Sequence, residues 1–384
     1  MKILHTADWH LGKIVHYLHM TEDQRFILNE FLSIVKRVKP DAVIIAGDLY
    51  DRSIPPKEAV ELLNQVLTRL TNELAVPVLA ISGNHDSPDR LEFGAELFRK
   101  QGLYLETKLK KNREPITLYD DDGPVHFHLI PYLEPAEVAY VFEDDRIKTH
   151  HQAAEQLIKD IHDRFNMAER HIWVGHAFLA GGMETDSEER LSMIGGSPYV
   201  EAGLFQSFTY TALGHLHQPQ QVTSPSIRYS GSILKYSFSE ARHHKSVTLV
   251  ELPPEGRPII DKIPLVPMRD FEIVEGYFEE LMKGEAASSM ENYLHIRLLD
   301  DGQLIDPMGK LRKIYPNILY LERKNVARDQ QLSELNKMKE RQQMSHLDLI
   351  ASFYEELKGT SMPEERKHLV QQAIAALKET ERGR

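Results

Sequence analysis

The first half of the chain alternates short apolar runs with longer stretches in which apolar residues recur at helical spacing. Residues 42–46 and 78–82 are almost entirely apolar, as in strands that are buried on both faces, and residues 2–5 form a shorter run. Between them, residues 21–39 and 56–74 carry an apolar side chain every three or four positions. This alternation predicts an α/β fold with helices packed on a mainly parallel sheet.

The same patterns continue beyond this point, with a hairpin between them. Residues 90–100 and 149–165 have helical spacing. Residues 116–130 contain the turn sequence Asp121-Asp122-Gly123, which is typical of two strands joined by a tight connection. Further strands are predicted at residues 171–175 and 210–213, and the β-rich stretch at 227–265 is expected to form a second sheet that closes the layer.

We expect the chain to divide into four segments. Behind the β-rich stretch, three strand-like runs at 271–274, 293–299 and 318–322 alternate with helix-like ones and carry no cluster of metal ligands. A polar, charged stretch follows them. The resulting division is a catalytic domain at 1–265, a small α/β cap domain at 266–324, a linker at 325–344 and a helical segment at 345–384.

The last segment is predicted to be a hairpin of two amphipathic helices. Leu347, Ile350 and Phe353 begin one apolar stripe, which Gly359 ends, and Ser361 to Glu364 matches a capping box that opens a second helix. Such a hairpin could fold back on its own domain, or it could dock an amphipathic or coiled-coil partner. The pattern alone favours neither.

The composition restricts which residues can bind a metal and where the protein can act. The chain has 384 residues and no cysteine, so a metal must be held by His, Asp, Asn or Glu. No apolar run reaches the roughly 18 to 20 residues that cross a bilayer, and the N-terminus leads straight into a candidate ligand motif, so we expect a cytoplasmic protein without a signal peptide. The net charge of -12 is not typical of a nucleic-acid enzyme, although bound cations or a basic partner could offset this charge.

Five short segments contain residues that bind metals in proteins. An isolated Asp-x-His is weak evidence, because it is more often a loop or helix-cap pair. All five segments, in one order and each after a predicted strand or a glycine, argue against coincidence. The segments are Asp8-Trp9-His10, Gly47-Asp48, Gly83-Asn84-His85-Asp86, Gly175-His176 and Gly214-His215-Leu216-His217.

This ligand set is that of a two-metal phosphoesterase. The carboxylate of Asp48 has two oxygens, so it is the natural bridge between cations about 3.5 to 4 Å apart. In the strongest motif, the Asn84 amide oxygen can bind a metal, His85 can face a substrate phosphate and Asp86 can orient His85. Mixed nitrogen and oxygen ligands without thiolate suit manganese, iron or zinc.

The ordered set resembles the calcineurin-like metallophosphoesterase superfamily and, within it, the SbcD family of nuclease subunits. Further similar features are His5 to Gly12, Gly47 to Asp51, Ser82 to Ser87, Ser187-Glu188-Glu189-Arg190 with Gly195-Gly196, His217 to Gln220, and Tyr229 to Ser232 followed by Ser237-Phe238-x-Glu240. The resemblance covers the catalytic region, and the cap and helical tail also fit it. It implies a two-sheet sandwich flanked by helices, with an α/β cap and a C-terminal helical hairpin.

The resemblance also implies a role for each ligand. Asp8, His10, Asp48 and His217 would bind one Mn²⁺, and Asp48, Asn84, His176 and His215 would bind the other, although other divalent metals could replace manganese. His85 would contact the scissile phosphate, with Asp86 as its partner. The residues named as catalytic are therefore His85 and Asp86.

The function implied is that of a DNA nuclease subunit in repair, recombination and replication. It would act at the nucleoid with an SbcC-like ATPase as an ATP-dependent 3′-5′ double-strand exonuclease and a single-strand and hairpin endonuclease. The C-terminal helices would hold the ATPase, and a homodimer formed near residues 56–70 and 90–100 would sit within a heterotetramer. Two alternatives stay open: a small-molecule phosphodiesterase or phosphatase, and a catalytically silent scaffold.

Overall fold

The computed structural model describes residues 1–188, 199–324, 346–358 and 360–372. Its main body is built on two six-stranded sheets. The first sheet has the order β14 (Ile259–Pro264), β13 (Ser246–Glu251), β1 (Lys2–Thr6), β4 (Ala42–Ala46), β5 (Val78–Ile81) and β6 (Leu103–Glu106). The second has the order β11 (Gln220–Val222), β12 (Ser224–Tyr229), β10 (Tyr210–Gly214), β9 (Arg170–His176), β8 (Gly123–Leu129) and β7 (Ile116–Asp120).

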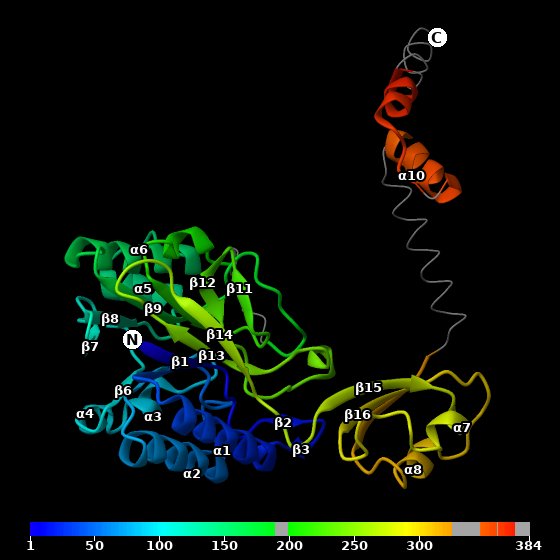
Figure 1. Ribbon diagram of the computed structural model, residues 1–384, viewed down its shortest axis with the longest axis horizontal. Helices are drawn as coiled ribbons and strands as arrows, with labels where there is room; N and C mark the ends of the chain where they lie inside the picture. The colour runs from blue at the N-terminus through cyan, green and yellow to red at the C-terminus, as the bar shows by residue number, and fades with distance from the viewer. Residues whose placement is uncertain (189–198, 325–345, 359, 373–384) are drawn as a thin grey trace.

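The two sheets pack face to face, and helices cover their outer faces. Alternate residues of one strand go to opposite sides: Ile44 packs in the core between the sheets, whereas Val43 and Ile45 pack against the helices. Figure 1 shows α1 (Thr21–Val38) and α2 (Lys57–Thr68) on one side and α5 (Pro135–Phe142) and α6 (His150–Arg164) on the other. The two-sheet sandwich flanked by helices is therefore confirmed.

The central strands of both sheets run parallel. In the first sheet β1, β4, β5 and β6 are parallel neighbours, and in the second β8, β9, β10 and β12 are. Antiparallel strands complete the edges, including the β7–β8 hairpin, in which Asp120 pairs with Gly123 as the turn sequence predicts. Because parallel strands end on the same side, the segments that follow β1, β4, β5, β9 and β10 meet there.

Two predictions about elements were wrong in detail. Residues 90–100 are not one helix: α3 (Pro88–Glu92) and α4 (Ala95–Arg99) are separated by Gly94, whose φ of 79° is left-handed. The stretch at 227–265 does not all join the second sheet, since β13 pairs with β1 and β14 pairs with β13 in the first. Residues 56–74 begin as the predicted helix α2 and end in a π-helical turn, Arg69–Glu73.

A third sheet follows the sandwich in the chain. Its strands β15 (Phe271–Gly276), β16 (Tyr293–Leu298) and β17 (Ile318–Arg323) are all parallel, with α7 (Phe278–Leu281) and α8 (Pro307–Leu311) in the two crossovers. This unit has an apolar core of its own, and Figure 1 shows it beside the small hairpin of β2 (Ile14–Val15) and β3 (Leu18–His19). The Tyr293 hydroxyl donates to Asp23 Oδ2 at 2.8 Å, which joins the third sheet to α1.

The predicted helical tail is present in its described parts. One helix is α10 (His346–Lys358), and residues 364–372 are also helical. The predicted linker at 325–344, the stop at Gly359 and the end of the second helix lie outside the described residues. Among the helices that the structure describes, none combines the length and the apolar character needed to cross a bilayer.

Candidate metal centre

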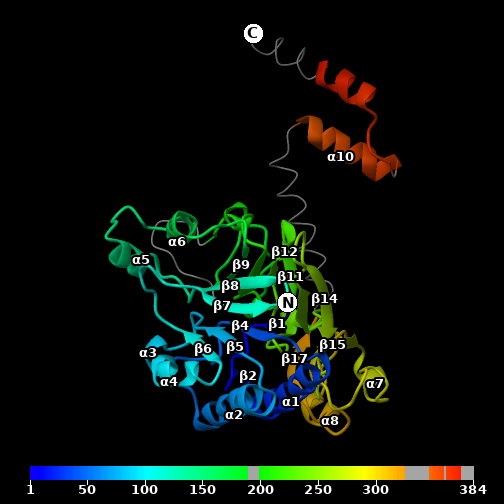
Figure 2. The ribbon, with the colours of Figure 1, turned by 60° about the vertical axis from the view of Figure 1, so that its left-hand side comes forward.

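The candidate ligands lie at the carboxyl ends of five parallel strands, where the two sheets face each other. Figure 2 shows the two sheets facing each other, with β1, β4 and β5 of the first sheet on one side and β8 and β9 of the second on the other. The sequence thus predicted a meeting of side chains that are up to 209 positions apart in the chain, from Asp8 to His217. Asp8 and His10 follow β1, Asp48 follows β4, Asn84 and His85 follow β5, His176 ends β9, and His215 and His217 follow β10.

Glycines before the ligands allow this close approach. A Cβ atom on Gly83 would lie 2.1 Å from Asp48 Oδ1, and one on Gly214 would lie 1.8 Å from the Ala46 carbonyl oxygen. Real Cβ atoms do not come so close to backbone or ligand atoms. Glycine is therefore required at both positions for the strand ends to bring their ligands together.

One group of contacts surrounds His10. Its Nε2 lies 3.0 Å from Nε2 of His217 and 3.6 Å from Oδ2 of Asp48, and its ring is fully buried. Two facing imidazole nitrogens can share at most one proton. Asp8, His10 and Asp48 also form a group whose ligand atoms all lie within 4.8 Å of one another.

A second group surrounds Asn84. Its Oδ1 lies 3.0 Å from Nε2 of His176 and 3.3 Å from Nδ1 of His215. His176 Nε2 is also 3.3 Å from Asp48 Oδ2, while its Nδ1 is 2.9 Å from the Ala46 carbonyl oxygen. That carbonyl fixes the ring so that Nε2 faces Asn84 and Asp48.

The two groups share Asp48, and their backbone is strained. Asp8, His10 and Asp48 have φ values of 53°, 45° and 50°, and His215 has a φ of 107°. Residues other than glycine rarely adopt positive φ, and where they do the strain is commonly found at functional sites. The Asp8 carboxylate links the groups, because its Oδ1 accepts the backbone N–H of His215 at 2.9 Å.

Burial and mutual charge set the proton affinities of these groups. Burial lowers the pKa of His10 to about 3, so its ring is neutral and can offer a lone pair. Burial would also lower the pKa of His176, but the Asp48 carboxylate outweighs it and raises that pKa to about 9. Burial alone would raise the pKa of Asp48, but the charge of His176 outweighs it and holds that pKa well below its usual range. A cation beside Asp48 would displace the His176 proton, since a ligating imidazole must be neutral.

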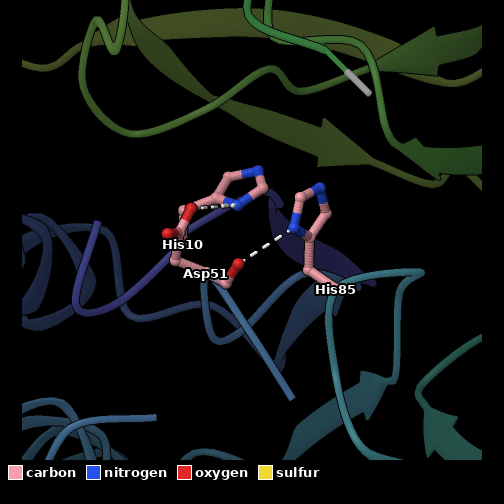
Figure 3. A group of neighbouring side chains, drawn as sticks. All are labelled: His10, Asp51 and His85. Carbon is pink, nitrogen blue, oxygen red and sulfur yellow. Dashed lines mark hydrogen bonds and ion pairs between the residues drawn. The ribbon is translucent and has the colours of Figure 1, made fainter. Parts of the chain in front are cut away.

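His85 lies beside this set rather than within it. Its Nδ1 is 2.9 Å from the Asp51 carbonyl oxygen, and its backbone N–H donates to Asp48 Oδ1 at 3.0 Å. Figure 3 shows the His85 ring next to that of His10, and their centroids are 4.8 Å apart. The side chain of Asp51 contacts His10 Nδ1 at 3.5 Å and accepts from Lys13 at 2.7 Å. Sequence reasoning assigned Asp51 no role, although it lies within the Gly47 to Asp51 motif.

Asp86 is engaged with backbone donors. Its Oδ2 accepts from the N–H groups of Leu49 at 3.1 Å and Gly83 at 2.9 Å, and its Oδ1 accepts from Tyr50 at 2.9 Å. The group that the structure places on the His85 ring nitrogen is the Asp51 carbonyl oxygen. Asp86 thus ties the loop after β4 to the loop after β5.

His217 is held by side chains from motifs to which the sequence assigned no role. Its Nδ1 lies 3.0 Å from Ser187 Oγ and 3.2 Å from Glu240 Oε1, and its backbone N–H donates to Glu188 at 2.8 Å. Glu240 is buried against Lys245, whose charge overcomes burial and holds the pKa of Glu240 well below its usual range. These residues lie in or near the motifs noted above, of which Glu189-Arg190 and Gly195-Gly196 lie outside the described residues.

The donor set fits divalent cations. Asp8 Oδ2 is buried and has no hydrogen-bond partner within the described residues, which is costly unless another group binds there. Carboxylate oxygens, imidazole nitrogens and one amide oxygen converge without a thiolate, as they do for manganese, iron or zinc. The arrangement can therefore hold divalent metal.

Comparison with known proteins agrees with this geometry. Residues 1–219 match the family model for calcineurin-like phosphoesterases. The chain is a metal-dependent phosphoesterase of this class, and residues 267–358 match the type 5 capsule protein repressor C-terminal domain, SbcD_C. More narrowly, it belongs to the family of SbcD subunits of nuclease SbcCD.

Two relatives support that assignment. The SbcD subunit of nuclease SbcCD from Staphylococcus saprophyticus is 38% identical over 381 residues, which cover 99% of both chains. The same subunit from Staphylococcus epidermidis is 39% identical over 332 residues, 86% of each chain.

Two solved structures are similar to this chain at low identity. A crystal structure of a Thermus thermophilus protein has a TM-score of 0.38 at 12% identity and covers 69% of this chain and 99% of its own. A dimetal phosphatase from Danio rerio has a TM-score of 0.43 at 14% identity, and the match covers 69% of this chain and 96% of the phosphatase.

Proposed function

We propose that this chain is the nuclease subunit of an SbcC-SbcD-like complex, which hydrolyses DNA phosphodiester bonds with two Mn²⁺ ions. Likeness to the SbcD subunit of nuclease SbcCD along nearly the whole chain supports the substrate and the complex. The proposed activities are 3′-5′ exonuclease on duplex ends and endonuclease on single strands and hairpins.

The single observation that carries the chemistry is the position of Asp48. Its Oδ2 lies 3.6 Å from His10 Nε2 and 3.3 Å from His176 Nε2, so one carboxylate faces an imidazole of each group. A two-metal phosphoesterase needs such a bridging carboxylate. This arrangement favours a paired centre over a single structural ion.

The chain's own residues would hold the cations and orient the substrate. When bound, the cations neutralise charge on the phosphate and lower the pKa of a water molecule. The buried carboxylates and neutral imidazoles fix the positions of both ions and exclude bulk water. The proposed ligands are Asp8, His10, Asp48 and His217 for one ion, and Asp48, Asn84, His176 and His215 for the other.

We infer separate roles for the two residues named as catalytic. His85 is only partly buried, and Nδ1 faces the Asp51 carbonyl, so Nε2 can face a phosphate. There it would stabilise developing charge or deliver a proton to the leaving oxygen. Asp86 already accepts three backbone N–H groups, and we infer that it positions Asp48 and His85 rather than moving a proton.

We further propose that the enzyme depends on a partner and is built in four segments. We propose a nuclease domain at 1–265, a cap domain at 266–324, a linker at 325–344 and a docking segment at 345–384. Leu349, Ile350 and Phe353 on α10 are 39%, 42% and 60% exposed. This apolar face suits an SbcC-like coiled coil, and the ATPase would supply much of the DNA-holding surface that an acidic chain lacks.

We also propose a homodimer, within a heterotetramer, through the surface of α3 and α4. Phe93 and Leu97 are 85% and 73% exposed there, and Val60 on the neighbouring α2 is 44% exposed. A homodimer interface would cover such side chains. Light scattering on Phe93→Ser/Leu97→Ser should show a monomer, whereas an unchanged dimer would place the interface elsewhere.

The experiment that tests the function uses an end-labelled hairpin duplex, Mn²⁺ and the purified full chain, alone and with its ATPase partner. We expect cleavage by the wild type and a loss of at least a hundredfold in Asp48→Ala. Asp121→Ala, which changes an exposed aspartate in the β7–β8 turn, should cleave normally. Equal cleavage by Asp48→Ala would assign the activity to a contaminant.

A second substrate separates the alternatives. Hydrolysis of bis(p-nitrophenyl) phosphate without any DNA cleavage, even with the partner present, would favour the small-molecule phosphodiesterase. Failure to bind Mn²⁺ and to hydrolyse either substrate would favour the silent scaffold.

A further inference from the structure

The outer face of the second sheet carries another group of histidines. His126 on β8 and His171 on β9 are register partners on neighbouring parallel strands. His128 is two residues beyond His126, so it lies on the same face, whereas Phe127 between them packs into the core between the sheets. With Thr117 on β7 and Glu169 just before β9, these residues form what we call the outer-face histidine cluster.

This cluster is separate from the candidate metal centre. His171 lies near the start of β9 and His176 at its end. Five residues of extended strand span about 16 Å, so the two positions lie at opposite ends of β9. The centre at the carboxyl ends of the strands therefore cannot use these side chains.

Three side chains of the cluster can reach one ion. The ligand atoms of His126, Glu169 and His171 all lie within 4.8 Å of one another, and His126 Nε2 is 2.9 Å from Glu169 Oε2. Zinc holds nitrogen and oxygen ligands at about 2.0 to 2.2 Å, so two ligands of one tetrahedral ion are about 3.4 Å apart. Small side-chain rotations would bridge that difference, because the Glu169 side chain is 47% exposed.

The second nitrogen of each of these imidazoles is already held. His126 Nδ1 lies 2.9 Å from Thr117 Oγ1, and His171 Nδ1 lies 2.9 Å from His128 Nε2. Metal-binding histidines typically have such a partner, which fixes the ring and directs the other nitrogen at the ion. In His126 the arrangement leaves Nε2 to bind an ion, whereas in His171 the Nε2 atom must first give up its contact with the Asn166 carbonyl oxygen.

One contact must change when an ion binds. His171 Nε2 is 3.0 Å from the Asn166 carbonyl oxygen, so its proton would move to Nδ1, where His128 can accept. The Asn166 carbonyl keeps a partner, because it also accepts the Glu169 backbone N–H at 3.0 Å. The rearrangement therefore leaves no buried polar group without a hydrogen bond.

We propose that the outer-face histidine cluster binds one Zn²⁺ through His126 Nε2, His171 Nε2 and the Glu169 carboxylate. Two imidazoles and a carboxylate without thiolate form a ligand set that zinc accepts, with water completing the tetrahedron. The ion would tie the turn before β9 to β8. It would act as a structural clamp and is independent of the function proposed above.

The test counts zinc in the full chain. After equilibrium dialysis against buffered Zn²⁺, mass spectrometry should find one zinc fewer per chain in Glu169→Gln and His126→Gln than in the wild type. The control is His162→Gln on α6, whose Nε2 contacts Ser207 Oγ at 2.8 Å, and it should bind as much zinc as the wild type. Asp48→Ala should lose zinc at the other centre yet still differ by one ion from Asp48→Ala/Glu169→Gln.

A crystal soaked in Zn²⁺ gives a direct readout. We expect an anomalous difference peak about 2 Å from Nε2 of both His126 and His171. Equal zinc counts in all variants and no peak would overturn the proposal and leave His126 and Glu169 as an ion pair. Because Glu169 is exposed, its variant decides the question even where His126→Gln does not fold.

Discussion

Asp86 lies in the candidate centre, yet its hydrogen bonds within the described residues all go to backbone N–H groups of the two loops that carry Asp48 and His85. In Asp86→Asn an NH₂ group replaces one of the oxygens and faces a backbone donor. We expect a loss of about 1 to 3 kcal/mol in the free energy of unfolding and a parallel fall in hydrolysis. Urea titration and bis(p-nitrophenyl) phosphate turnover on one preparation measure both.

Asp89→Asn is the matched control, because the Asp89 side chain is 85% exposed and pairs only at the surface with Lys108. It should leave stability and turnover within experimental error. If Asp86→Asn keeps full stability but loses activity, its role is in proton transfer rather than positioning.

His5 makes part of the free energy of unfolding depend on pH. It is fully buried in β1 with Nδ1 3.0 Å from the Tyr210 hydroxyl, and burial lowers its pKa from 6.5 to about 3. Because the folded pKa is below the unfolded one, the stability is fully present above pH 6.5 and is lost as the pH falls toward 3. At pH 4 the loss is about 3 kcal/mol.

His5→Gln keeps a side-chain amide for Tyr210 but cannot take up a proton. Urea unfolding at pH 7 and pH 4 should therefore show a smaller decrease in stability for this variant than for the wild type. An equal decrease in both proteins would mean that His5 does not contribute to acid sensitivity.

The contacts of some residues in the candidate site could be predicted from the sequence, and those of others could not. Asp48 and His176 could be expected to meet, because each lies at the carboxyl end of a buried parallel strand. Asp51 and Glu240 could not be given partners in advance, since their contacts to His10 and His217 depend on how distant loops pack. Their motifs were visible, but spacing along the chain carries no information about such tertiary contacts.

At the scale of elements, helix α1 supports the loop that carries Asp8 and His10. Gln24 donates to the His10 carbonyl oxygen at 2.7 Å and accepts the Gly12 N–H at 3.0 Å. Gln24→Leu would leave the Gly12 N–H buried without its partner, whereas the His10 carbonyl oxygen would keep the Lys13 N–H at 3.0 Å. We expect a loss of roughly 1 to 3 kcal/mol in unfolding free energy and at least tenfold weaker manganese-dependent hydrolysis.

Ser33→Ala on the same helix is its control, since the Ser33 hydroxyl donates to the Asn29 carbonyl oxygen of its own helix at an exposed position. Thermal unfolding and turnover at several Mn²⁺ concentrations would compare the two. Activity in Gln24→Leu equal to that of Ser33→Ala would show that α1 does not position the loop.

Periodicity predicted most central elements but not their partners. The alternation in 246–251 and 259–264 indicates strands, yet only tertiary packing places β13 beside β1 in the first sheet. In residues 90–100 the helical spacing continued across Gly94, where the left-handed φ ends the first helix. The local pattern therefore predicts an element more reliably than its interruptions or its sheet.

At the scale of the whole molecule, one turn of α1 joins the third sheet to the candidate centre. Asp23 accepts from Tyr293 at 2.8 Å and contacts Arg269 at 3.3 Å. The next residue, Gln24, holds the His10 carbonyl. A displacement of the third sheet would thus act on α1 at the turn that supports the His10 loop, which gives the proposed cap a route to influence hydrolysis.

Substitutions on the C-terminal helices can separate partner binding from catalysis. Leu349, Ile350 and Phe353 lie within about 100° of arc on α10, a width that suits a docking stripe. The Arg366 guanidinium donates to the Tyr354 hydroxyl at 3.1 Å, so the following helix contacts α10 beside this stripe. Both helices can therefore contribute to one surface.

We expect Ile350→Asp/Phe353→Asp to weaken binding of the SbcC-like ATPase at least a hundredfold, because two carboxylates would be buried in an apolar interface. Hydrolysis of bis(p-nitrophenyl) phosphate by the isolated chain should not change, since α10 carries none of the proposed ligands. Glu355→Lys, on the opposite side of α10 and exposed, should bind the ATPase like the wild type. Calorimetric titration with the purified ATPase measures the affinities, and undiminished binding by the double variant would move the docking surface away from α10.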